Sequence, residues 1–483
     1  MAKEFIVAIG LGSSKITGIA GKKNTDGSIS VLAVVREDSS SCIRKGVVYN
    51  IDKTAQCLTN IISRLRTSLG TEISQVYVGL GGQSVRGIKN VIGKNLPPET
   101  IVTQAMVNEL MDANRAMTYP DAKILDAIIQ EFRVDTQLQL DPVGIQASRL
   151  EANFLNILCR RSFYNSLKRC FDMAGIAIAD TFLSAVTLAD SVLTENERRS
   201  GCLLVDLGAE TTTVALYYRD ILRHLSVIPL GSNNITKDIE SLQIDENEAE
   251  RMKLKFASAY TDSADIDKSL HLRVNDDRSI DSTLFIEIVE ARLEEIIENV
   301  WFQVPTEYTD KILGGIVLTG GGSNMPNIET AFRRKTHIDK VRVAKFVSFN
   351  VTVANSKVTL PRDATMNTVL SLVAAGNMNC AGGDVNNTLF NPEGEPTQSQ
   401  RAPGSMMQSG RTVQKNSAEE DEERRRKEDE ERKRKEEEAE LKRIEEEEAE
   451  LKRKEEERKR NSWFNKTMRK TKDFFHKMVE PEN

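Results

Sequence analysis

The 483-residue chain has few of the residues that build metal centres and covalent cross-links. Its six cysteines are scattered, without a CxxC pair. That pattern favours free thiols in a reducing compartment over a disulfide framework. The four histidines show neither an HExxH motif nor another ligand-like spacing. We therefore expect no zinc site and no histidine-based catalytic triad.

Long apolar runs are also missing. No run approaches the roughly 20 residues that cross a bilayer, and the start, MAKEFIVAIG, lacks a signal-peptide pattern. We expect a cytosolic protein, or one that touches a membrane only from its surface. The apolar fraction is low, at 39%, but the length still suffices for two or more domains with cores of their own.

Charge is concentrated in one segment, residues 419–460, which holds 21 acidic and 16 basic residues. Acids repeatedly precede bases by four residues, as in Glu423/Lys427 and Glu431/Lys435, the favourable orientation for helix ion pairs. An isolated ion-paired helix is the leading interpretation, with disorder and a coiled coil as alternatives. Apolar residues are too sparse here for heptads. Because acids neutralise the basic blocks within one turn, we expect no nucleic-acid partner.

Two similar strand clusters occur in the first 380 residues. FIVAIGL, ITGIAG and ISVLAVV predict a meander at the N-terminus, and CLLVDLG, TTTVALYY and ILRHLSVIPLG repeat that order from residue 202. Helical periodicity marks residues 53–69 and 104–117, and a long amphipathic helix ends near Trp301. The repeat predicts a duplicated α/β core with a ligand cleft between its halves.

Three glycine-containing turns follow apolar strands, at Gly12-Ser13-Ser14-Lys15, Asp206-Leu207-Gly208 and Gly320-Gly321-Gly322. Glycine lets a backbone approach phosphate oxygens closely and offer N–H groups to them. Any one such turn more often just joins two strands. Neither a P-loop nor a GxGxxG dinucleotide fingerprint is present. The order of the three turns is what favours a phosphate site.

These motifs resemble those of the actin-like ATPase superfamily, and within it the bacterial division family FtsA. VAIGLGSSKITGIAG resembles the first phosphate loop, LLVDLGAETTTVALYY the second, and GGIVLTGGGSNMPNIETAFRR the adenosine motif. The segment with DPVGIQASRLEA resembles the inserted subdomain of that family. The resemblance covers about residues 4–380.

The resemblance implies an actin-like, ribonuclease H-like duplicated α/β core with inserted subdomains, followed by a charged helical stem and an amphipathic helix. We expect subdomain 1A, the inserted subdomain 1C, the first part of 2A, subdomain 2B, and the second part of 2A with a return helix. A linker, the stem and the terminal helix follow. The expected boundaries are 1–83, 84–162, 163–235, 236–309, 310–380, 381–417, 418–460 and 461–480.

The resemblance also implies an ATP site with Mg²⁺. Ser13, Ser14 and Lys15 would face the β-phosphate side, and Asp206 would hold the metal through water. Glu250 and Lys253 would flank the adenosine. The full set of implied cofactor residues is Gly12, Ser13, Ser14, Lys15, Asp206, Gly208, Glu210, Glu250, Lys253, Gly320, Gly321 and Gly322.

Three positions depart from the family pattern. Gly10 stands where the first loop usually carries an acid, Glu210 replaces a loop glycine, and Thr213 stands at a later acid position. Since phosphoryl transfer depends on positioned metal and water, we expect weak or absent hydrolysis. An unshielded carboxylate at Glu210 would repel a triphosphate.

Residues 462–479, SWFNKTMRKTKDFFHKMV, place aromatic and apolar side chains along one helix face, with bases between them. That profile is typical of an interfacial membrane helix; a ligand for a protein groove is the alternative. The expected membrane-binding residues are Trp463, Phe464, Lys466, Met468, Arg469, Lys470, Phe474, Phe475 and Met478.

The implied function is a filament-forming adaptor that tethers the FtsZ division ring to the inner face of the cytoplasmic membrane at the septum and recruits other division proteins. Arg292 and Glu295 match positions implicated in binding the FtsZ C-terminal peptide, although a solvated helix face explains them equally simply. The alternatives are a PilM-type pilus adaptor and a small-molecule kinase on the same fold. A chaperone of the Hsp70 type would need a substrate-binding β domain after residue 380.

Overall fold

The structure is a computed structural model that describes residues 4–267, 269–275, 278–354 and 358–381. The predicted linker beyond residue 381, the charged stem and the amphipathic terminal helix lie outside these residues. Within them, the helices fall short of the length and apolar character that a membrane crossing requires.

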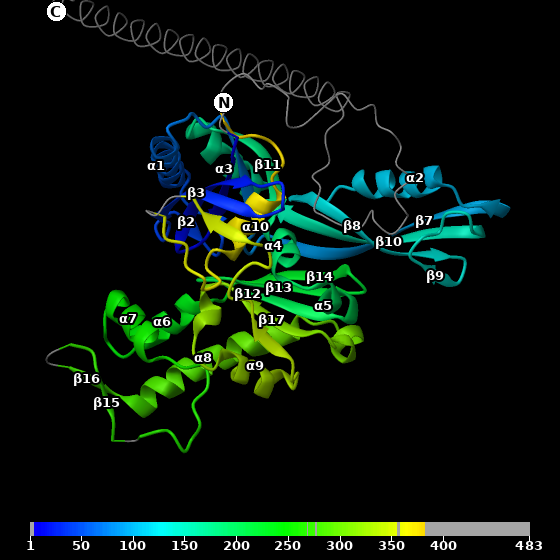
Figure 1. Ribbon diagram of the computed structural model, residues 1–483. Coiled ribbons are helices and arrows are strands. Elements are labelled where there is room, and N and C mark those ends of the chain that lie inside the picture. The colour runs from blue at the N-terminus through cyan, green and yellow to red at the C-terminus, as the bar shows by residue number, and fades with distance from the viewer. Residues whose placement is uncertain (1–3, 268, 276–277, 355–357, 382–483) are drawn as a thin grey trace, which may run out of the picture. The chain divides into compact units, whose positions relative to one another are not determined.

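A six-stranded sheet carries the N-terminal meander that the sequence predicts. β1 pairs antiparallel with β2, and β2 with β3, while β6, β11 and β19 add in parallel. The strand order is β11-β6-β1-β2-β3-β19. The strands span β1 Ile6–Leu11, β2 Lys15–Lys23, β3 Ile29–Asp38, β6 Gln75–Leu80, β11 Ala177–Leu183 and β19 Val351–Val353 (Figure 1).

A five-stranded sheet repeats this topology. β12 pairs antiparallel with β13, and β13 with β14, while β17 and β18 add in parallel on the other side of β12. The order β14-β13-β12-β17-β18 therefore corresponds to β3-β2-β1-β6-β11 of the first sheet. The strands span β12 Cys202–Leu207, β13 Thr212–Tyr218, β14 Ile221–Ile228, β17 Gly315–Thr319 and β18 Val341–Val343.

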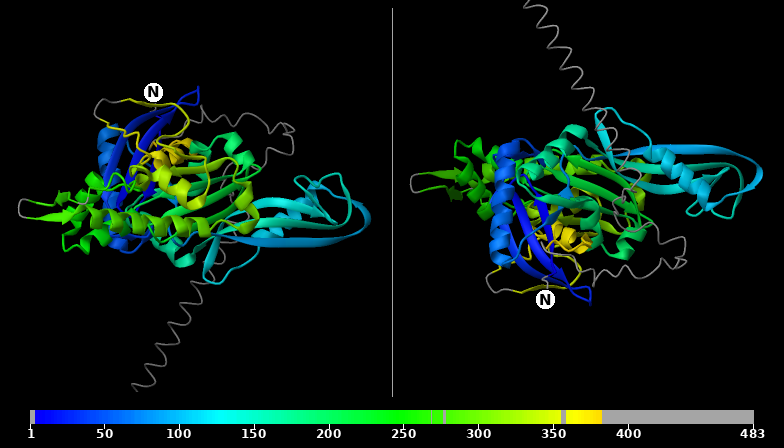
Figure 2. Two further views of the ribbon diagram at one scale, coloured as in Figure 1. Left: turned by 90° about the horizontal axis from the view of Figure 1, so that it is seen from below. Right: turned by 90° about the horizontal axis from the view of Figure 1, so that it is seen from above.

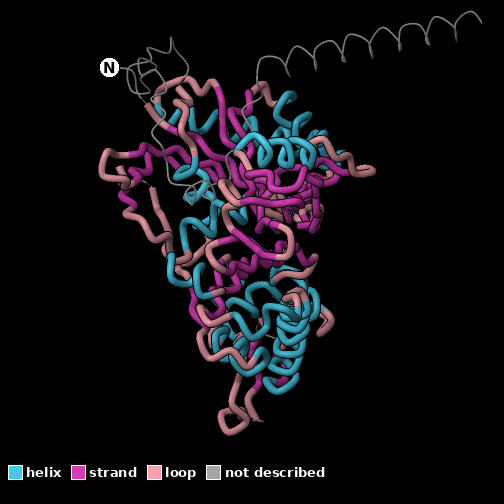
Figure 3. The backbone as a smooth tube through the Cα atoms, turned by 90° about the vertical axis from the view of Figure 1, so that its right-hand side faces the viewer, coloured by secondary structure: helices cyan, strands magenta, loops and turns pink. Residues whose placement is uncertain are grey.

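Helices cover both sheets (Figure 3). α1 (Ile51–Leu69) begins where the Asn50 side chain accepts the Lys53 N–H, and ends at Gly70 in the left-handed conformation. Its apolar stripe, which includes Leu58 and Ile61, is buried in the core of the first sheet, to which α3 (Arg161–Met173) also contributes. α4 (Ser184–Val192) and α10 (Asn367–Ala375) pack against each other and complete that core.

In the view from below in Figure 2, the long helix α8 (Ser282–Phe302) runs across the second sheet. Its buried face packs in one core with β12, β13 and α9 (Ile328–Thr336). β15 and β16 form a short hairpin before α8. The elements span α5 Glu195–Ser200, α6 Ser232–Glu240, α7 Glu246–Phe256, β15 His271–Arg273, β16 Ser279–Asp281, α8 Ser282–Phe302, η1 Thr306–Lys311, η2 Gly321–Asn324 and α9 Ile328–Thr336.

Between β6 and α3 lies an inserted four-stranded antiparallel sheet with the order β7-β10-β8-β9. Helix α2 packs on it, and the two share a small core of their own that includes Leu110, Phe132 and Phe154. The elements span β7 Arg86–Ile101, α2 Gln104–Arg115, β8 Ala122–Val134, β9 Gln137–Gln139 and β10 Gln146–Arg160.

The order of the elements along the chain does not follow their grouping into sheets at two places. β11 follows the insert yet lies in the first sheet, and β19 and α10 return to that sheet after the second one is complete. The chain therefore crosses between the two sheets more than once. The predicted subdomain boundaries as a whole stay a prediction.

Candidate functional site

One cavity of about 740 Å³ is lined by residues of both sheets, a size within the usual range for small-molecule sites. It brings together eleven of the twelve cofactor residues predicted from the sequence. These are Gly12, Ser13, Ser14, Lys15, Asp206, Gly208, Glu250, Lys253, Gly320, Gly321 and Gly322. Glu210, the twelfth, is not among the lining residues.

The first two glycine loops have the same backbone turn. The Gly12 N–H donates to the Lys15 carbonyl at 3.1 Å, and the Gly208 N–H donates to the Thr211 carbonyl at 2.9 Å. Strand registers align the flanks as well, because Gly10 pairs with Thr17 in one hairpin and Asp206 pairs with Thr213 in the other. The two loops are thus structural counterparts, and both line the same cavity.

Each loop is held by hydrogen bonds from another segment of its own half. That segment follows β3 in the first half and β14 in the second. The Ser39 hydroxyl donates to the Gly12 carbonyl at 2.7 Å. In the other half, the Ser232 and Asn233 N–H groups at the start of α6 donate to the carbonyls of Gly208 and Ala209, at 3.0 and 2.7 Å. These bonds hold the loop backbones in place before any ligand binds.

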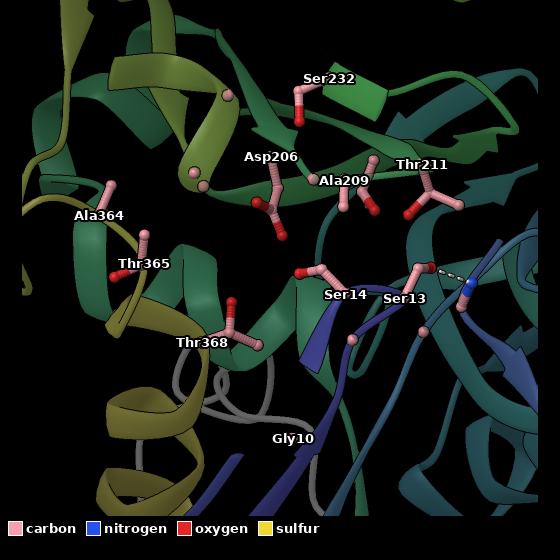
Figure 4. Close-up of a pocket in the computed structure, with 18 of the residues that line it drawn as sticks. Gly10, Ser13, Ser14, Asp206, Ala209, Thr211, Ser232, Ala364, Thr365 and Thr368 are labelled. Atoms are coloured by element: carbon pink, nitrogen blue, oxygen red, sulfur yellow. Dashed lines mark hydrogen bonds between the residues drawn. The ribbon is translucent and has the colours of Figure 1, made fainter. Parts of the chain in front are cut away.

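Asp206 lies next to the last residue of strand β12, and its carboxylate points into the cavity, toward the side from which Ser14 projects (Figure 4). The surrounding protein desolvates this carboxyl and raises its pKa to about 6. It is nevertheless mostly ionised at neutral pH. A bound cation would relieve the cost of that buried charge.

The donor set fits Mg²⁺ bound mainly through water and ligand oxygens. Among the described residues there is no group of three His, Cys, Asp or Glu side chains able to hold a metal. Mg²⁺ commonly uses one or two carboxylates together with waters and phosphate oxygens. Asp206 can supply that one carboxylate.

Space for the Asp206 carboxylate comes from Gly320, the residue that directly follows β17. A Cβ at Gly320 would lie 2.3 Å from Asp206 Oδ1 and 2.6 Å from the Leu207 carbonyl oxygen. Gly320 also has φ +83, a conformation that glycine adopts without strain. Gly320 therefore allows close approach to Asp206 and Leu207, while the predicted approach of this glycine run to phosphate stays a prediction.

The position of Gly10 is filled differently. A Cβ there would lie 2.6 Å from Val369 Cγ1 on α10. The valine side chain occupies the space that an acidic side chain at this position would need. Position 10 therefore lacks the carboxylate expected there, and Val369 fills the space that this carboxylate would occupy.

Lys15 lies at the start of β2, half-buried at the cavity. Burial and the neighbouring Arg36 lower the pKa of its ammonium group, while the Asp363 carboxylate acts in the opposite direction. A phosphate group would stabilise the charged form in the same way.

Glu250 and Lys253 line the cavity from α7, but their charges pair within the protein. The Lys253 ammonium donates to the Thr236 hydroxyl at 2.8 Å and lies 2.6 Å from Glu250 Oε2. The Thr236 hydroxyl donates in turn to Glu250 Oε2 at 2.6 Å. Lys253 is 6% exposed. This network, in which Lys253 is buried and Glu250 is partly exposed, joins α6 and α7 at the edge of the cavity.

The Glu210 carboxylate bonds to the first half of the core. Its Oε2 accepts the Lys45 N–H at 2.6 Å, at the tip of a hairpin formed by β4 (Ile43–Arg44) and β5 (Val47–Val48). The next N–H, of Gly46, donates to the Ser13 hydroxyl at 2.8 Å, the dashed line in Figure 4. The carboxylate expected to face the phosphates is thus engaged elsewhere.

Arg292 and Glu295 lie together on α8, and neither lines the cavity. The Arg292 guanidinium donates to both carboxylate oxygens of Asp238 on α6 and to Glu295. These partners raise the pKa of Arg292 further. Their predicted role in binding a peptide stays a prediction.

Several lining residues were not singled out from the sequence. The glycines in the turn after β6 are compatible with a phosphate loop, but in the sequence they look like the end of a buried strand. The segment before α10 has no motif at all, and only the chain's return to the first sheet brings it here. The missed residues include Gly79, Gly81, Gly82, Ser184, Ser232, Asn233, Asp363, Ala364, Thr365, Thr368 and Val369.

The duplicated sheets, with paired loops at one cavity, define an actin-like α/β protein, the fold class predicted from the sequence. The solved structure of a PilM-PilN type IV pilus biogenesis complex is similar, with a TM-score of 0.52 at 16% sequence identity. The match covers 76% of this chain and 97% of that one. At such identity the likeness concerns the fold alone.

Sequence comparison then gives the family. Residues 203–368 match the family model for cell division protein FtsA, and residues 82–158 match the SHS2 domain inserted in FTSA. Cell division protein FtsA of Porphyromonas gingivalis is 30% identical over 357 residues, which is 71% of this chain and 74% of that relative. The Bacillus subtilis protein of that name is 30% identical over 333 residues, 67% of this chain and 75% of that relative. The chain belongs to the FtsA family, and the resemblance drawn from its motifs is confirmed.

Proposed function

We propose that the cavity binds ATP with Mg²⁺. The observation that carries this proposal is the pair of equivalent loop turns, one from each sheet, at one cavity into which the Asp206 carboxylate points. Ser13, Ser14 and Lys15 offer hydroxyl and ammonium donors to the phosphates, and Asp206 holds hydrated Mg²⁺. Glu250 and Lys253 border the adenosine, with Gly320–Gly322 beneath it.

Hydrolysis is weak or absent in this proposal. Phosphoryl transfer requires a metal and a water held in place. Asp206 is one carboxylate at the cavity, whereas its counterpart Gly10 and its strand partner Thr213 have none. A small-molecule kinase would need a carboxylate base for its substrate, and neither Gly10 nor Thr213 supplies one at the positions expected for it.

The protein acts as an adaptor in cell division. It forms filaments, binds the C-terminal peptide of FtsZ through a surface that includes Arg292 and Glu295, and recruits other division proteins. Because the Arg292 guanidinium already pairs with Asp238 and Glu295, an acidic peptide there would exchange partners with this network. That exchange suits reversible binding.

The segment 462–479 attaches the filament to the inner face of the cytoplasmic membrane at the septum. Each Lys or Arg near an anionic surface contributes roughly 1 kcal/mol, and the apolar face adds its burial. Part of this gain is offset by ordering the helix. A single copy therefore binds reversibly, while many copies on one filament gain perhaps 10²-fold or more by avidity.

Co-sedimentation with anionic liposomes tests the proposal. We expect the full chain to pellet with lipid, more strongly with ATP·Mg²⁺, and a chain ending at Arg460 to stay in solution. A full-length Trp463→Ser, Phe475→Ser variant keeps the basic charge and separates apolar insertion from electrostatic attraction. Equal binding by the shortened chain would show that the terminal segment is not the anchor.

A further inference from the structure

The tip of the β4–β5 hairpin touches both phosphate-type loops. Lys45 and Gly46 form its two-residue turn with φ values of 50 and 70. Positive φ at both central residues is the geometry that fits the twist of a tight hairpin. Two successive N–H groups are thereby presented at the tip, each with an oxygen acceptor from a different half of the core.

The tip is fixed firmly to the first half. The Gly46 N–H donates to the Ser13 hydroxyl at 2.8 Å, and the Gln83 N–H donates to the Lys45 carbonyl at 3.0 Å. The backbone also lies against the turn after β6, because a Cβ at Gly46 would be 2.5 Å from the Gly82 Cα. The hairpin therefore moves with the six-stranded sheet.

The bond to Glu210 joins this hairpin to the second half. Glu210 lies in the loop between β12 and β13, and its Oε2 accepts the Lys45 N–H at 2.6 Å. A hydrogen bond to an ionised acceptor is stronger than a neutral one. Ser14, the counterpart of Glu210 in the first loop, has no carboxylate to make the reciprocal bond.

We propose that Glu210 is a positioning residue that latches the two halves of the cleft together before nucleotide binds. Its carboxylate connects the two loops through the hairpin tip, a connection that bound phosphates would otherwise have to supply. The latch raises the fraction of ligand-free molecules in which the two loops are already placed for binding. The idea that nucleotide is the ligand rests on the proposed function; the latch itself does not.

The latch and the repulsion expected from the sequence predict opposite results. If Glu210 repelled the phosphates, its removal would tighten ATP binding. If it pre-closes the cleft, its removal lowers the population of the competent state, and the apparent affinity falls by the same factor. The Glu210 carboxylate bonds to Lys45, and Glu210 is not among the residues that line the cavity, which favours the latch.

Amide hydrogen exchange of the full chain without nucleotide is the first test. We expect the Lys45 amide to exchange about tenfold faster in Glu210→Ala than in the wild type, because its acceptor is gone. Glu210→Gln keeps an acceptor oxygen of the same reach and should remain close to the wild type. Glu287→Ala, at an exposed position on α8, controls for the loss of a carboxylate. Equal exchange in Glu210→Ala and the wild type would overturn the latch.

Titration with ATP·Mg²⁺ is the second arm. Weaker binding by Glu210→Ala, with Glu210→Gln between it and the wild type, supports the latch, whereas tighter binding overturns it. If none of the proteins binds ATP but the exchange difference at Lys45 persists, the latch stands and the nucleotide proposal fails. The two conclusions are therefore separable.

Discussion

The two halves of the core share a backbone and differ in the side chains that this backbone presents. The β1–β2 and β12–β13 loops make the same glycine turn, with hydrogen bonds of 3.1 and 2.9 Å. Aligned on their strand registers, Gly10-Leu11-Gly12-Ser13-Ser14-Lys15 corresponds to Asp206-Leu207-Gly208-Ala209-Glu210-Thr211. The first half offers hydroxyl and ammonium donors, and the second offers carboxylates. The two halves thus have the same loop backbone but present different functional groups to the cavity.

The difference extends to what surrounds each position. In the second half Asp206 has room because Gly320 beside it lacks a side chain. In the first half the small residue is Gly10, and Val369 from α10 takes the space. In both halves a glycine leaves space for a larger neighbouring side chain. That side chain is the uncharged Val369 in the first half and the Asp206 carboxylate in the second. The weak hydrolysis that we propose would therefore depend on packing at Val369 as well as on the residue at position 10.

The largest expected effect comes from closing that space in the second half. In Gly320→Ala the new Cβ meets both the Asp206 carboxylate and the Leu207 carbonyl, at a positive φ. We expect a loss of unfolding free energy of more than about 3 kcal/mol. ATP binding should be abolished. Urea unfolding followed by circular dichroism, with ATP titration of the folded fraction, measures both.

Two glycines make matched controls for this substitution. Gly27 has a similar φ of +82 but open space around it, so Gly27→Ala isolates backbone strain, about 1 kcal/mol. Gly81 lines the cavity and has open space at its Cβ, so Gly81→Ala tests the addition of a methyl group there. If Gly320→Ala proved no more damaging than Gly27→Ala, close approach to Asp206 would not explain the glycine.

How much of this the sequence predicted depends on how local each signal is. The paired strand clusters and glycine turns are local patterns, so the duplicated fold and the glycine-turn residues at the cavity were within reach, whereas Glu250 and Lys253 came only from the family resemblance. Val369 and the segment before α10 are not, because more than 350 residues separate Val369 from Gly10. Glu210 was predicted to face phosphate; its bond to Lys45 depends on how the two halves meet. The terminal anchor lies outside the described residues and stays a prediction.

A smaller effect is expected for Asp206→Asn. Burial raises the pKa of Asp206 to about 6, from the ordinary aspartate value of 3.8. A carboxyl whose pKa is raised by folding favours the folded state at low pH, and that contribution is lost as pH rises through the two values. Without Mg²⁺, the variant should therefore match the wild type near pH 4 and exceed its stability by about 1–3 kcal/mol above pH 6.5.

Mg²⁺·ATP should reverse this order. The metal stabilises the ionised carboxylate in the wild type, while the amide of Asp206→Asn gives it no charge to bind. Thermal unfolding from pH 4 to 8, with and without Mg²⁺·ATP, measures the sign of the stability difference between Asp206→Asn and the wild type in both conditions. Asp265→Asn, at an exposed position, should show neither. A constant offset between wild type and Asp206→Asn at every pH would contradict the raised pKa.

The smallest expected energy is the coupling between two substitutions that make the halves more alike. Gly10→Asp gives the first half the carboxylate of its counterpart, but its Cβ collides with Val369 Cγ1. We expect about 2 kcal/mol of destabilisation from Gly10→Asp alone, and a similar loss from Val369→Ala, which removes buried methyl groups. Together they should cost less than the sum, with a coupling of about 1 kcal/mol, because each change relieves the other.

Only the double variant should recover chemistry. With two carboxylates facing the cavity from equivalent loops, its ATPase rate should exceed that of either single variant, since the added charge can help to place metal and water. Steady-state phosphate release, with urea unfolding of all four proteins, gives the rate and the coupling energy together. Additive stabilities would mean that Val369 does not hold the space at Gly10. Full coupling without a gain in rate would place the hydrolytic deficit in the second half, at Thr213 or at the latched Glu210.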